Sequence, residues 1–499
     1  MPLLIRATTT PIVAVSAIVV AVSALALRLR LSHLGLSPSS FALPDLPAFD
    51  PDNRLCGIDV ERIGDGDLVY PECLVVVVVS ASDDDDDDDQ GGGAPGTMFA
   101  SLGDGRVVRL TGIDEPSGPT WSTVLRTGPS VDALTRGGAS AAADEEDEDD
   151  DDDYDDDRGG DYGRRCGSGG PSDDHPIHGP SEHICGRPLG MWLSTPSSGR
   201  TTTTRRREDD VLLVADAYRG LLSVSGNIYG LPGPGKAEVR VLATRADSDP
   251  PGYKFALLNS VLQIPDDSGG DVYMTETSTR FQRRRIFHAV MDGAPDGRLL
   301  RYRPKEKTVE VVADGIYMAN GLALTHDGTG LLVVSGVRIL RYDISSGTLD
   351  TTRPFVDAMP GTGDNVKTMD VLPNGERRRC YWVALGGTYK RPFSILKFLS
   401  DMPMLRSVLL AIVPYRKLID LIPKWTALAV YGEDGALIDT LTDDGGTATT
   451  GGEDGKATTV GGVTAPWISE AEPAGDYLYL ASWYNPFLAR IDKRDIKFE

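Results

Sequence analysis

Short apolar segments separated by turns recur along the chain in a unit that appears six times. Each unit has an apolar run ending in small or polar residues, followed after a turn by a second short strand. The six runs are Met98–Ser101, Leu212–Asp216, Val272–Glu276, Leu331–Ser335, Tyr381–Leu385 and Leu478–Ser482. Short apolar runs bounded by turns are typical of strands, and repetition at a regular spacing is typical of propellers. We therefore predict an all-β fold, a six-bladed β-propeller over residues 45–499.

Four low-complexity stretches interrupt the repeat, whose copies are otherwise mostly about fifty to sixty residues apart. Two are rich in aspartate or glutamate, and the others are rich in threonine, glycine or arginine. They cover residues 83–96, 137–180, 198–208 and 445–460. Such segments bury too little apolar surface to offset the entropy of ordering them. We predict that all four are disordered surface loops.

A fifth insertion, residues 393–424, has a different character. Its apolar positions predict two short helices divided near Pro403 and Pro414, because proline interrupts a helix. Two interpretations remain open: a helical lid packed on the propeller, or an amphipathic element that touches a membrane. The second would use the basic residues Arg406, Arg416, Lys417 and Lys424.

The N-terminal residues 1–34 contain an uncharged apolar run from Pro11 to Leu27, with arginines on both sides. Seventeen helical residues span roughly 25 Å, slightly less than the ~30 Å hydrocarbon core of a bilayer. The segment is either a hydrophobic helix that anchors the chain in a membrane or a signal peptide cleaved near Ala24–Ala26. Both interpretations predict entry into the secretory pathway, with a lumenal or extracellular propeller in the endoplasmic reticulum, the vacuole or at the cell surface.

The formal net charge of -24 is concentrated in two tracts. Asp83–Asp89 supplies seven acids and the stretch 144–157 supplies thirteen, so the rest of the chain carries about -4. The chain has no basic stripe with interleaved aromatic residues, which argues against a nucleic-acid partner.

The five cysteines are an odd number and lack the spacing of a zinc site. In an oxidising compartment Cys166 and Cys185 are the most natural disulfide pair, which would contribute about 3 kcal/mol. Cys73 and Cys380 adjoin apolar runs and are expected to be free buried thiols.

Candidate metal ligands lie at the beginnings of predicted inner strands, where a propeller's side chains converge on its axis. They are Glu72, Asn259, Asn320, Asp364 and Asn365. Carboxylate and amide oxygens are the ligands that Ca²⁺ prefers. The alternative is that these residues only form turns, in which asparagine and aspartate are common.

Several longer motifs identify a family. EHICGRPLGMWLS, LLVADAYRGLL, VYMTETSTRFQRRRIF, YMANGLALTHDG and GDNVK resemble the strictosidine synthase-like family, including the adipocyte plasma membrane-associated proteins and their plant counterparts. The resemblance covers most of residues 45–499 outside the insertions. It implies a six-bladed propeller, in agreement with the repeats.

The resemblance extends to the calcium-dependent phosphotriesterase superfamily, which includes the paraoxonases. Their catalytic calcium is held by a Glu, two Asn and an Asp-Asn pair, and Glu72, Asn259, Asn320 and Asp364–Asn365 occur in the same order. The resemblance therefore implies a central calcium ion. It does not imply a second, structural calcium, because Cys73 and Ser260 stand where acids would be expected.

Two departures from the superfamily affect catalysis. Leu189 stands where the paraoxonases have a histidine base, and leucine cannot transfer a proton. Ser469 stands where strictosidine synthase has its catalytic glutamate, so the Pictet–Spengler condensation of that enzyme is not expected here. Strand alternation would point the neighbouring Glu470 away from Ser469.

The leading hypothesis is a hydrolase acting on a small-molecule ester or lactone, with Ca²⁺ polarising the carbonyl group. The first alternative is a condensation of the strictosidine synthase type, in alkaloid biosynthesis. The second is a non-catalytic binding module tethered to a membrane through the N-terminal segment.

Overall fold

The computed structural model describes the greater part of the predicted propeller. The described residues are 43–44, 51–77, 96–128, 182–195, 209–230, 237–264, 270–388, 395–413, 417, 419, 422–445, 448–451, 457–460 and 464–497. They fall into two compact units. The larger one comprises residues 44–284, 295–389 and 423–499, and the smaller one comprises residues 1–43, 285–294 and 390–422.

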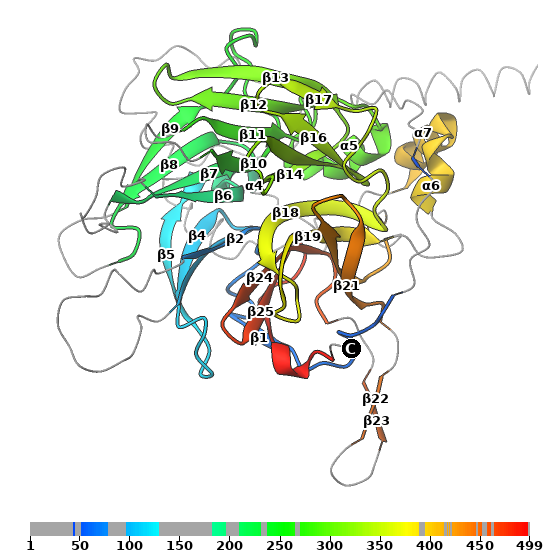
Figure 1. Ribbon diagram of the computed structural model, residues 1–499. Helices are drawn as coiled ribbons and strands as arrows, with labels where there is room; N and C mark the ends of the chain where they lie inside the picture. Colours follow the sequence, from blue (N-terminus) through cyan, green and yellow to red (C-terminus); the bar gives the residue numbers. More distant parts are fainter. Residues whose placement is uncertain are drawn as a thin grey trace, which may run out of the picture. The chain divides into compact units, whose positions relative to one another are not determined.

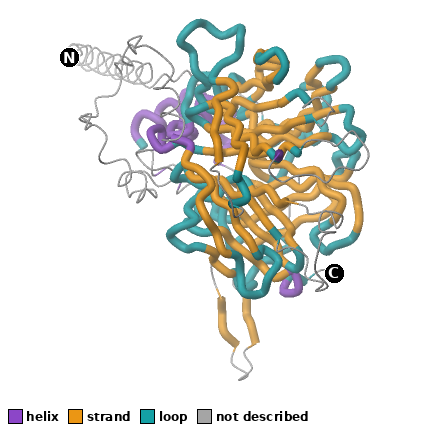
Figure 2. The backbone as a smooth tube through the Cα atoms, turned by 90° about the vertical axis from the view of Figure 1, so that its left-hand side faces the viewer, coloured by secondary structure: helices purple, strands orange, loops and turns teal. Residues whose placement is uncertain are grey.

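The larger unit is built from six four-stranded antiparallel sheets, and strands dominate its tube drawing (Figures 1 and 2). The first sheet is β2 (Leu74–Val77), β3 (Thr97–Ser101), β4 (Arg106–Thr111) and β5 (Thr120–Arg126). The second is β6 (Pro188–Ser194), β7 (Val211–Asp216), β8 (Gly220–Gly226) and β9 (Ala237–Ala243). The third is β10 (Leu258–Gln263), β11 (Val272–Glu276), β12 (Gly297–Arg303) and β13 (Thr308–Ile316).

The last three sheets complete the set. The fourth is β14 (Ala319–Leu324), β15 (Gly330–Ser335), β16 (Arg338–Asp343) and β17 (Thr348–Asp350). The fifth is β18 (Gly361–Val371), β19 (Arg377–Thr388), β20 (Thr426–Gly432) and β21 (Leu437–Asp443). The sixth is β24 (Ile468–Ala474), β25 (Tyr477–Ser482) and β26 (Leu488–Asp492), completed by β1 (Glu61–Ile63), which pairs with β26. Because the N-terminal strand completes the C-terminal sheet, it ties the two ends of the propeller together.

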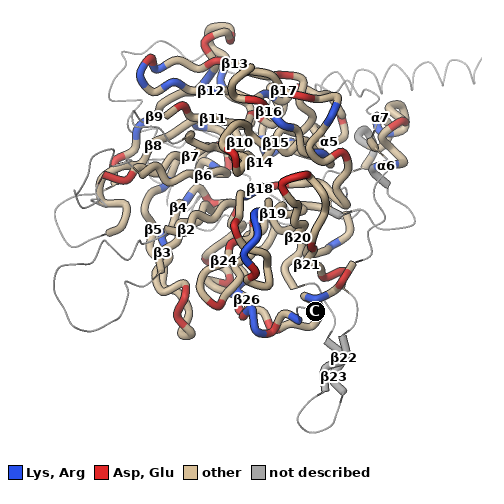
Figure 3. The backbone as a smooth tube through the Cα atoms, viewed as in Figure 1, with Lys and Arg blue, Asp and Glu red and all other residues tan. Residues whose placement is uncertain are grey.

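The first strands of the sheets form a closed ring. In the order β2, β6, β10, β14, β18 and β24, each contacts the next, and β24 contacts β2. Apolar side chains from neighbouring sheets fill the seams between blades, as with Leu74 of β2 and Tyr479 of β25. This geometry confirms the predicted six-bladed propeller: the six apolar runs of the sequence are β3, β7, β11, β15, β19 and β25, the second strand of every blade. Acidic and basic positions are interspersed along the described blades (Figure 3).

One predicted loop is wrong in part. Within the stretch 445–460, β22 (Ala448–Gly451) and β23 (Ala457–Val460) form an antiparallel pair, with Thr449 opposite Thr459 and Thr450 opposite Thr458. Threonine is β-branched and favours extended backbone, a preference that low complexity concealed. The other three low-complexity stretches lie outside the described residues, apart from Gly96.

The smaller unit contains the helices α5 (Ile286–Asp292), α6 (Ile395–Ser400) and α7 (Pro403–Ile412). The last two occur where the sequence predicts helices, and Pro403 stands at the beginning of α7, a position that tolerates proline. The Arg406 guanidinium of α7 donates to the Met291 carbonyl oxygen of α5 at 2.8 Å. The remaining short helices are α4 (Glu182–Cys185), η2 (Arg283–Arg285) and η3 (Lys493–Asp495).

Several sequence predictions concern residues outside the described part. The N-terminal apolar segment is one, and among the described helices none is long and apolar enough to cross a membrane. The disulfide between Cys166 and Cys185 is another, because Cys166 is not described. Cys73 and Cys380 are buried and free, as expected.

Candidate functional site

The predicted ligand residues lie on the ring of inner strands or directly before it. Glu72 precedes β2, Asn259 lies in β10, Asn320 in β14, and Asp364 and Asn365 in β18. All are buried except Asn320, which is partly buried. They therefore come from the first strands of blades one, three, four and five.

Asp364, Asn365 and Asn320 interact with Glu72 or with one another. Asn320 hydrogen-bonds to Asp364, and the Asp364 carboxyl is close enough to Glu72 to feel its charge. The Asn365 side-chain amide donates to the Glu72 carbonyl oxygen at 3.3 Å. The Asn259 amide donates to the Thr277 hydroxyl at 3.0 Å.

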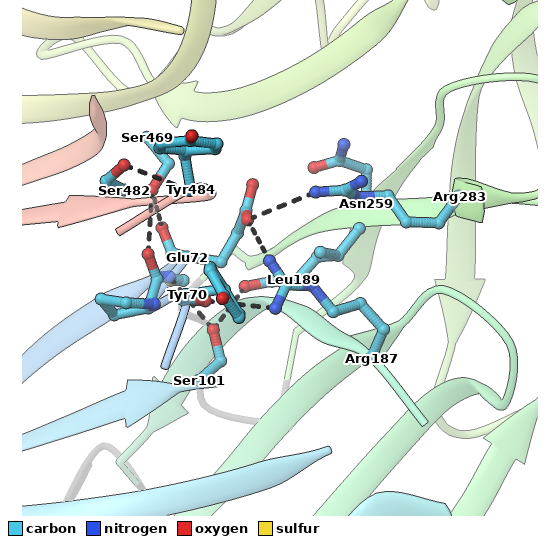
Figure 4. A network of polar contacts seen from close by, with 12 residues as sticks. Tyr70, Glu72, Ser101, Arg187, Leu189, Asn259, Arg283, Ser469, Ser482 and Tyr484 are labelled. Carbon is cyan, nitrogen blue, oxygen red and sulfur yellow. Dashed lines mark hydrogen bonds and ion pairs between the residues drawn. The ribbon is translucent and has the colours of Figure 1, made fainter. Parts of the chain in front are cut away.

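Two arginines that the sequence analysis missed converge on Glu72. The Arg187 guanidinium donates to Glu72 Oε2 at 2.6 Å and to the Tyr70 carbonyl oxygen at 3.1 Å. The Arg283 guanidinium lies 4.0 Å from the same carboxylate oxygen, and both arginines point toward it (Figure 4). Arg187 follows α4 and Arg283 begins η2, so the site draws on two further segments of the chain.

A second buried carboxylate, that of Glu182, also lies close to Arg187. Glu182 Oε1 lies 3.6 Å from Arg187 Nε, and Glu182 Oε2 accepts a hydrogen bond from the Tyr218 hydroxyl at 3.0 Å. Burial raises the pKa of Glu182, which the charges of Arg283 and Arg187 only partly offset. Arg187 is therefore held between two carboxylates, which fixes the guanidinium in one orientation.

The charge on Asp364 is unfavourable in its buried surroundings. Burial, and next the charge of Glu72, raise its pKa well above the ordinary value, while Asn320 and Arg283 offset part of the effect. A carboxyl group with a raised folded-state pKa loses stabilisation as pH rises through that pKa. Ionisation of Asp364 is therefore unfavourable in these surroundings, and a nearby cation would offset that cost.

The donor set is compatible with a calcium ion. Asn320 Oδ1 is buried without a hydrogen-bond partner, so an oxygen of the right type stands uncompensated next to Asp364. Two carboxylates and three amide oxygens are hard donors of the kind that Ca²⁺ takes. Among the described residues no three His, Cys, Asp or Glu side chains are grouped to hold a metal. Binding of a calcium ion at this site would therefore require the asparagine side-chain oxygens as ligands.

Leu189 and Ser469, which replace the catalytic groups expected from the family resemblance, make hydrogen bonds that join neighbouring segments of the chain. Leu189 in β6 is buried, and its carbonyl oxygen accepts a hydrogen bond from the Ser101 hydroxyl at 3.0 Å. The Ser469 hydroxyl donates to the Glu72 carbonyl oxygen at 2.8 Å (Figure 4). The register of β24 shifts between Ile468 and Glu470, and Glu470 also reaches this segment by accepting from the Leu74 amide at 3.1 Å. Ser469 and Glu470 thus both fix the chain around Glu72, although regular alternation would separate them.

A cluster of ion pairs is centred on Lys367 of β18, two residues after Asn365. The Lys367 ammonium group forms ion pairs with Glu470 and Glu472 and donates to the Leu74 carbonyl oxygen at 2.5 Å. Burial alone would lower the pKa of Lys367, but the charges of Glu470 and Glu472 outweigh it and raise that pKa. The lysine therefore joins the inner strands β2, β18 and β24 of three blades.

Aromatic side chains stand beside Asp364. The Trp467 and Trp483 rings stack with centroids 5.1 Å apart, and Tyr484 meets Trp467 edge-on at 4.6 Å. A Cβ atom on Gly386 would lie 3.1 Å from both Asp364 Oδ2 and Trp483 Nε1, so glycine at this position lets the indole and the carboxyl approach each other. The polar site thus has an apolar wall, of which Trp483 and Tyr484 are partly exposed.

Glycines on the inner strands set the spacing of the ring. A Cβ on Gly321 of β14 would lie 2.6 Å from the Val366 amide nitrogen of β18, and one on Gly190 of β6 would lie 2.6 Å from the Asn259 carbonyl oxygen. Each glycine adjoins a candidate site residue, since Gly321 follows Asn320. The close approach of these strands brings the asparagines of different blades within reach of one site.

Comparison with known proteins agrees with this architecture. Residues 261–346 match the model of the strictosidine synthase family. The adipocyte plasma membrane-associated protein of Gallus gallus is 30% identical over 327 residues, which are 64% of this chain and 68% of that protein. Protein strictosidine synthase-like 10 of Arabidopsis thaliana is 30% identical over 318 residues, 62% of this chain and 71% of that protein. The chain spans about two thirds of the length of these relatives.

The fold and the site define a six-bladed propeller with a polar centre assembled from its inner strands. The chain belongs to the strictosidine synthase-like family, together with the adipocyte plasma membrane-associated proteins. Among solved structures, a gluconolactonase of Xanthomonas campestris aligns with a TM-score of 0.41 at 12% identity, covering 92% of this chain and 98% of that one. A regucalcin of Agrobacterium tumefaciens aligns with a TM-score of 0.40 at 12% identity, covering 87% and 93%. Similarity at this level says nothing about the site.

Proposed function

We propose that the protein is a hydrolase of small esters or lactones whose central site is completed by Ca²⁺. The ligands would be Glu72, Asn259, Asn320, Asp364 and Asn365. The observation that carries the proposal is the buried Asp364 carboxyl beside the Glu72 charge and the unpartnered Asn320 oxygen. A buried arrangement of this kind is unfavourable by itself and is relieved by a cation.

The chain's own residues would prepare the site in three ways. Arg187 holds the Glu72 carboxylate in place, and Asn365 and Ser469 hold the Glu72 backbone. Arg283 brings N–H groups to the same region, where they could orient a substrate carbonyl oxygen (Figure 4). Bound Ca²⁺ would supply a Lewis acid that polarises that carbonyl group.

Trp483 and Tyr484 would form the apolar side of the substrate site. Both are partly exposed next to Asp364, and binding sites for small molecules combine such walls with few polar groups. Several relatives are named adipocyte plasma membrane-associated protein. That name supports a membrane location, reached through the secretory pathway.

A non-catalytic binding module is the second candidate, and Leu189 favours it. Its side chain is 1% exposed and apolar, and it stands where a proton-transferring base would be expected. A condensation of the strictosidine synthase type receives no such support, because the Ser469 hydroxyl is directed to backbone carbonyl oxygens.

Turnover of a panel of aryl esters and lactones, with and without Ca²⁺, tests the proposal. We expect hydrolysis that chelation abolishes and added Ca²⁺ restores. The variant Asp364→Ala should lose at least about a hundredfold in kcat/KM, the scale of removing one preorganised electrostatic group. Asp434→Ala, on an exposed turn between β20 and β21, is the matched control and should keep full activity. Absence of turnover on every substrate would favour the binding module.

A further inference from the structure

Exposed apolar side chains are concentrated on the helices of the smaller unit. Seven large apolar side chains are exposed in the described chain, and five of them lie within eleven residues. These five form what we call the helical apolar surface: Phe398, Met402, Met404, Leu405 and Val408. Met404 is the most exposed, at 73%. Soluble proteins rarely leave such groups clustered in contact with water unless the surface binds something.

Helix geometry places three of these side chains on one side of α7. Met404 and Val408 are four residues apart and Leu405 and Val408 three apart, so they are neighbours on the helix surface. Arg406 points the other way, because its guanidinium reaches Met291 of α5. The helix is thus packed against α5 on one side and presents apolar side chains on the other.

The charge of this region is opposite to that of the whole chain. Residues 390–422 contain six Lys or Arg and two Asp or Glu, a net charge of +4, whereas the chain carries -24. Lys417 is exposed. Apolar side chains with flanking basic residues are the combination that binds anionic lipid surfaces.

Leu43, which follows the N-terminal apolar run in the sequence, contacts this unit. The Lys397 ammonium group donates to the Leu43 carbonyl oxygen at 2.5 Å, so the chain following residue 42 is held on α6. Leu27, the end of the apolar run, is sixteen residues before Leu43. Sixteen residues span at most roughly 55 Å when fully extended. A bilayer that contains the N-terminal run would therefore always be within reach of α6 and α7.

We propose that the helical apolar surface docks onto an anionic lipid bilayer. The five side chains would enter the boundary between headgroups and acyl chains, and Lys417 would contact lipid phosphates or carboxylates. The contact is separate from any spanning segment and would fix the orientation of the unit on the membrane. It does not depend on the hydrolase proposal.

Depth-dependent fluorescence quenching tests this surface in the full chain. An environment-sensitive fluorophore is attached through an unnatural amino acid in place of Met404, and in a second protein in place of Leu437 of β21, which is 43% exposed. Each protein is mixed with vesicles of phosphatidylcholine alone or with phosphatidylserine, both containing a spin-labelled lipid quencher. We expect quenching at position 404, stronger with phosphatidylserine, and no quenching at position 437.

A triple variant distinguishes lipid binding by the helical apolar surface from lipid binding by the N-terminal segment. With the fluorophore in place of Phe398, the changes Met404→Ser, Leu405→Ser and Val408→Ser should raise the lipid concentration for half-maximal quenching at least about tenfold, the loss expected from removing even one buried apolar side chain. The change Leu437→Ser should leave it unchanged.

Three outcomes would overturn the proposal. Equal absence of quenching at positions 404 and 437 would exclude lipid contact. A blue-shifted emission at 404 in the absence of lipid would show that a second copy or the chain's own segment covers the surface. Equal quenching in both lipid mixtures would exclude the preference for anionic lipid.

Discussion

Replacement of Arg187 by methionine is expected to lower the free energy of unfolding by about 3–5 kcal/mol, the range for breaking a buried ion pair from one side. The Arg187 side chain is 2% exposed, and its guanidinium contacts the carboxylates of Glu72 and Glu182. Without it both acids stay buried with less compensation, and only Arg283 remains near Glu72. Denaturant unfolding of the two proteins, followed by tryptophan fluorescence, measures the difference.

An exposed arginine provides the control for this change. Arg240 lies 3.7 Å from Glu238, and both side chains are largely exposed, so Arg240→Met should change the free energy of unfolding by less than about 1 kcal/mol. The double variant Arg187→Met/Glu72→Gln should recover part of the loss, because it removes one of the two buried charges. An effect of Arg187→Met no larger than that of Arg240→Met would contradict the buried ion pair.

Replacement of Lys367 by methionine is expected to lower the free energy of unfolding by about 2–3 kcal/mol. Glu470 is 2% exposed and Glu472 12% exposed, and both lose the ammonium group that separates their charges. The value is set below the full range for buried pairs because about a quarter of the lysine side chain is exposed to solvent. The same unfolding measurement applies.

Removing the opposing charges together should reverse the effect of the lysine change. Lys367→Met/Glu470→Gln/Glu472→Gln should be more stable than Lys367→Met alone, because no uncompensated charge is left. Arg379→Met, which breaks an exposed pair with Glu433, is the control and should be nearly neutral. If the triple variant were less stable than Lys367→Met, the cluster would be held by packing and not by charge.

The propeller could be predicted because its signal is repeated. Each of the six apolar runs is the second strand of a blade. Neighbouring blades cover both faces of such a strand, so its residues stay apolar over four or five positions and do not alternate with polar ones. The low-complexity composition of this stretch hides the hairpin of β22 and β23. Its signal lies in the order of residues, because two ATT segments flank GGEDGK.

The candidate site was predictable only in part. Asn320 and Asp364 stand at strand beginnings, and the order of the acids and amides along the chain resembles a known pattern. Arg187 lies within CGRPLG, two residues before Leu189, and no local periodicity shows that a residue near α4 will meet Glu72. Lys367 likewise lies in an ordinary strand. Contacts between blades are set by ring closure, which sequence spacing does not encode.

Calorimetric titration of Ca²⁺ into the metal-free protein at neutral pH determines whether the centre of the propeller binds calcium. We expect one site for each chain, with binding lost in Asp364→Asn and weakened in Asn320→Ala. Asp434→Asn, a change of the same kind on an exposed turn, should bind as the wild type does. Absence of binding heat together with an unchanged melting temperature in Ca²⁺, or equal binding by wild type and Asp364→Asn, would contradict a calcium site at the centre of this propeller.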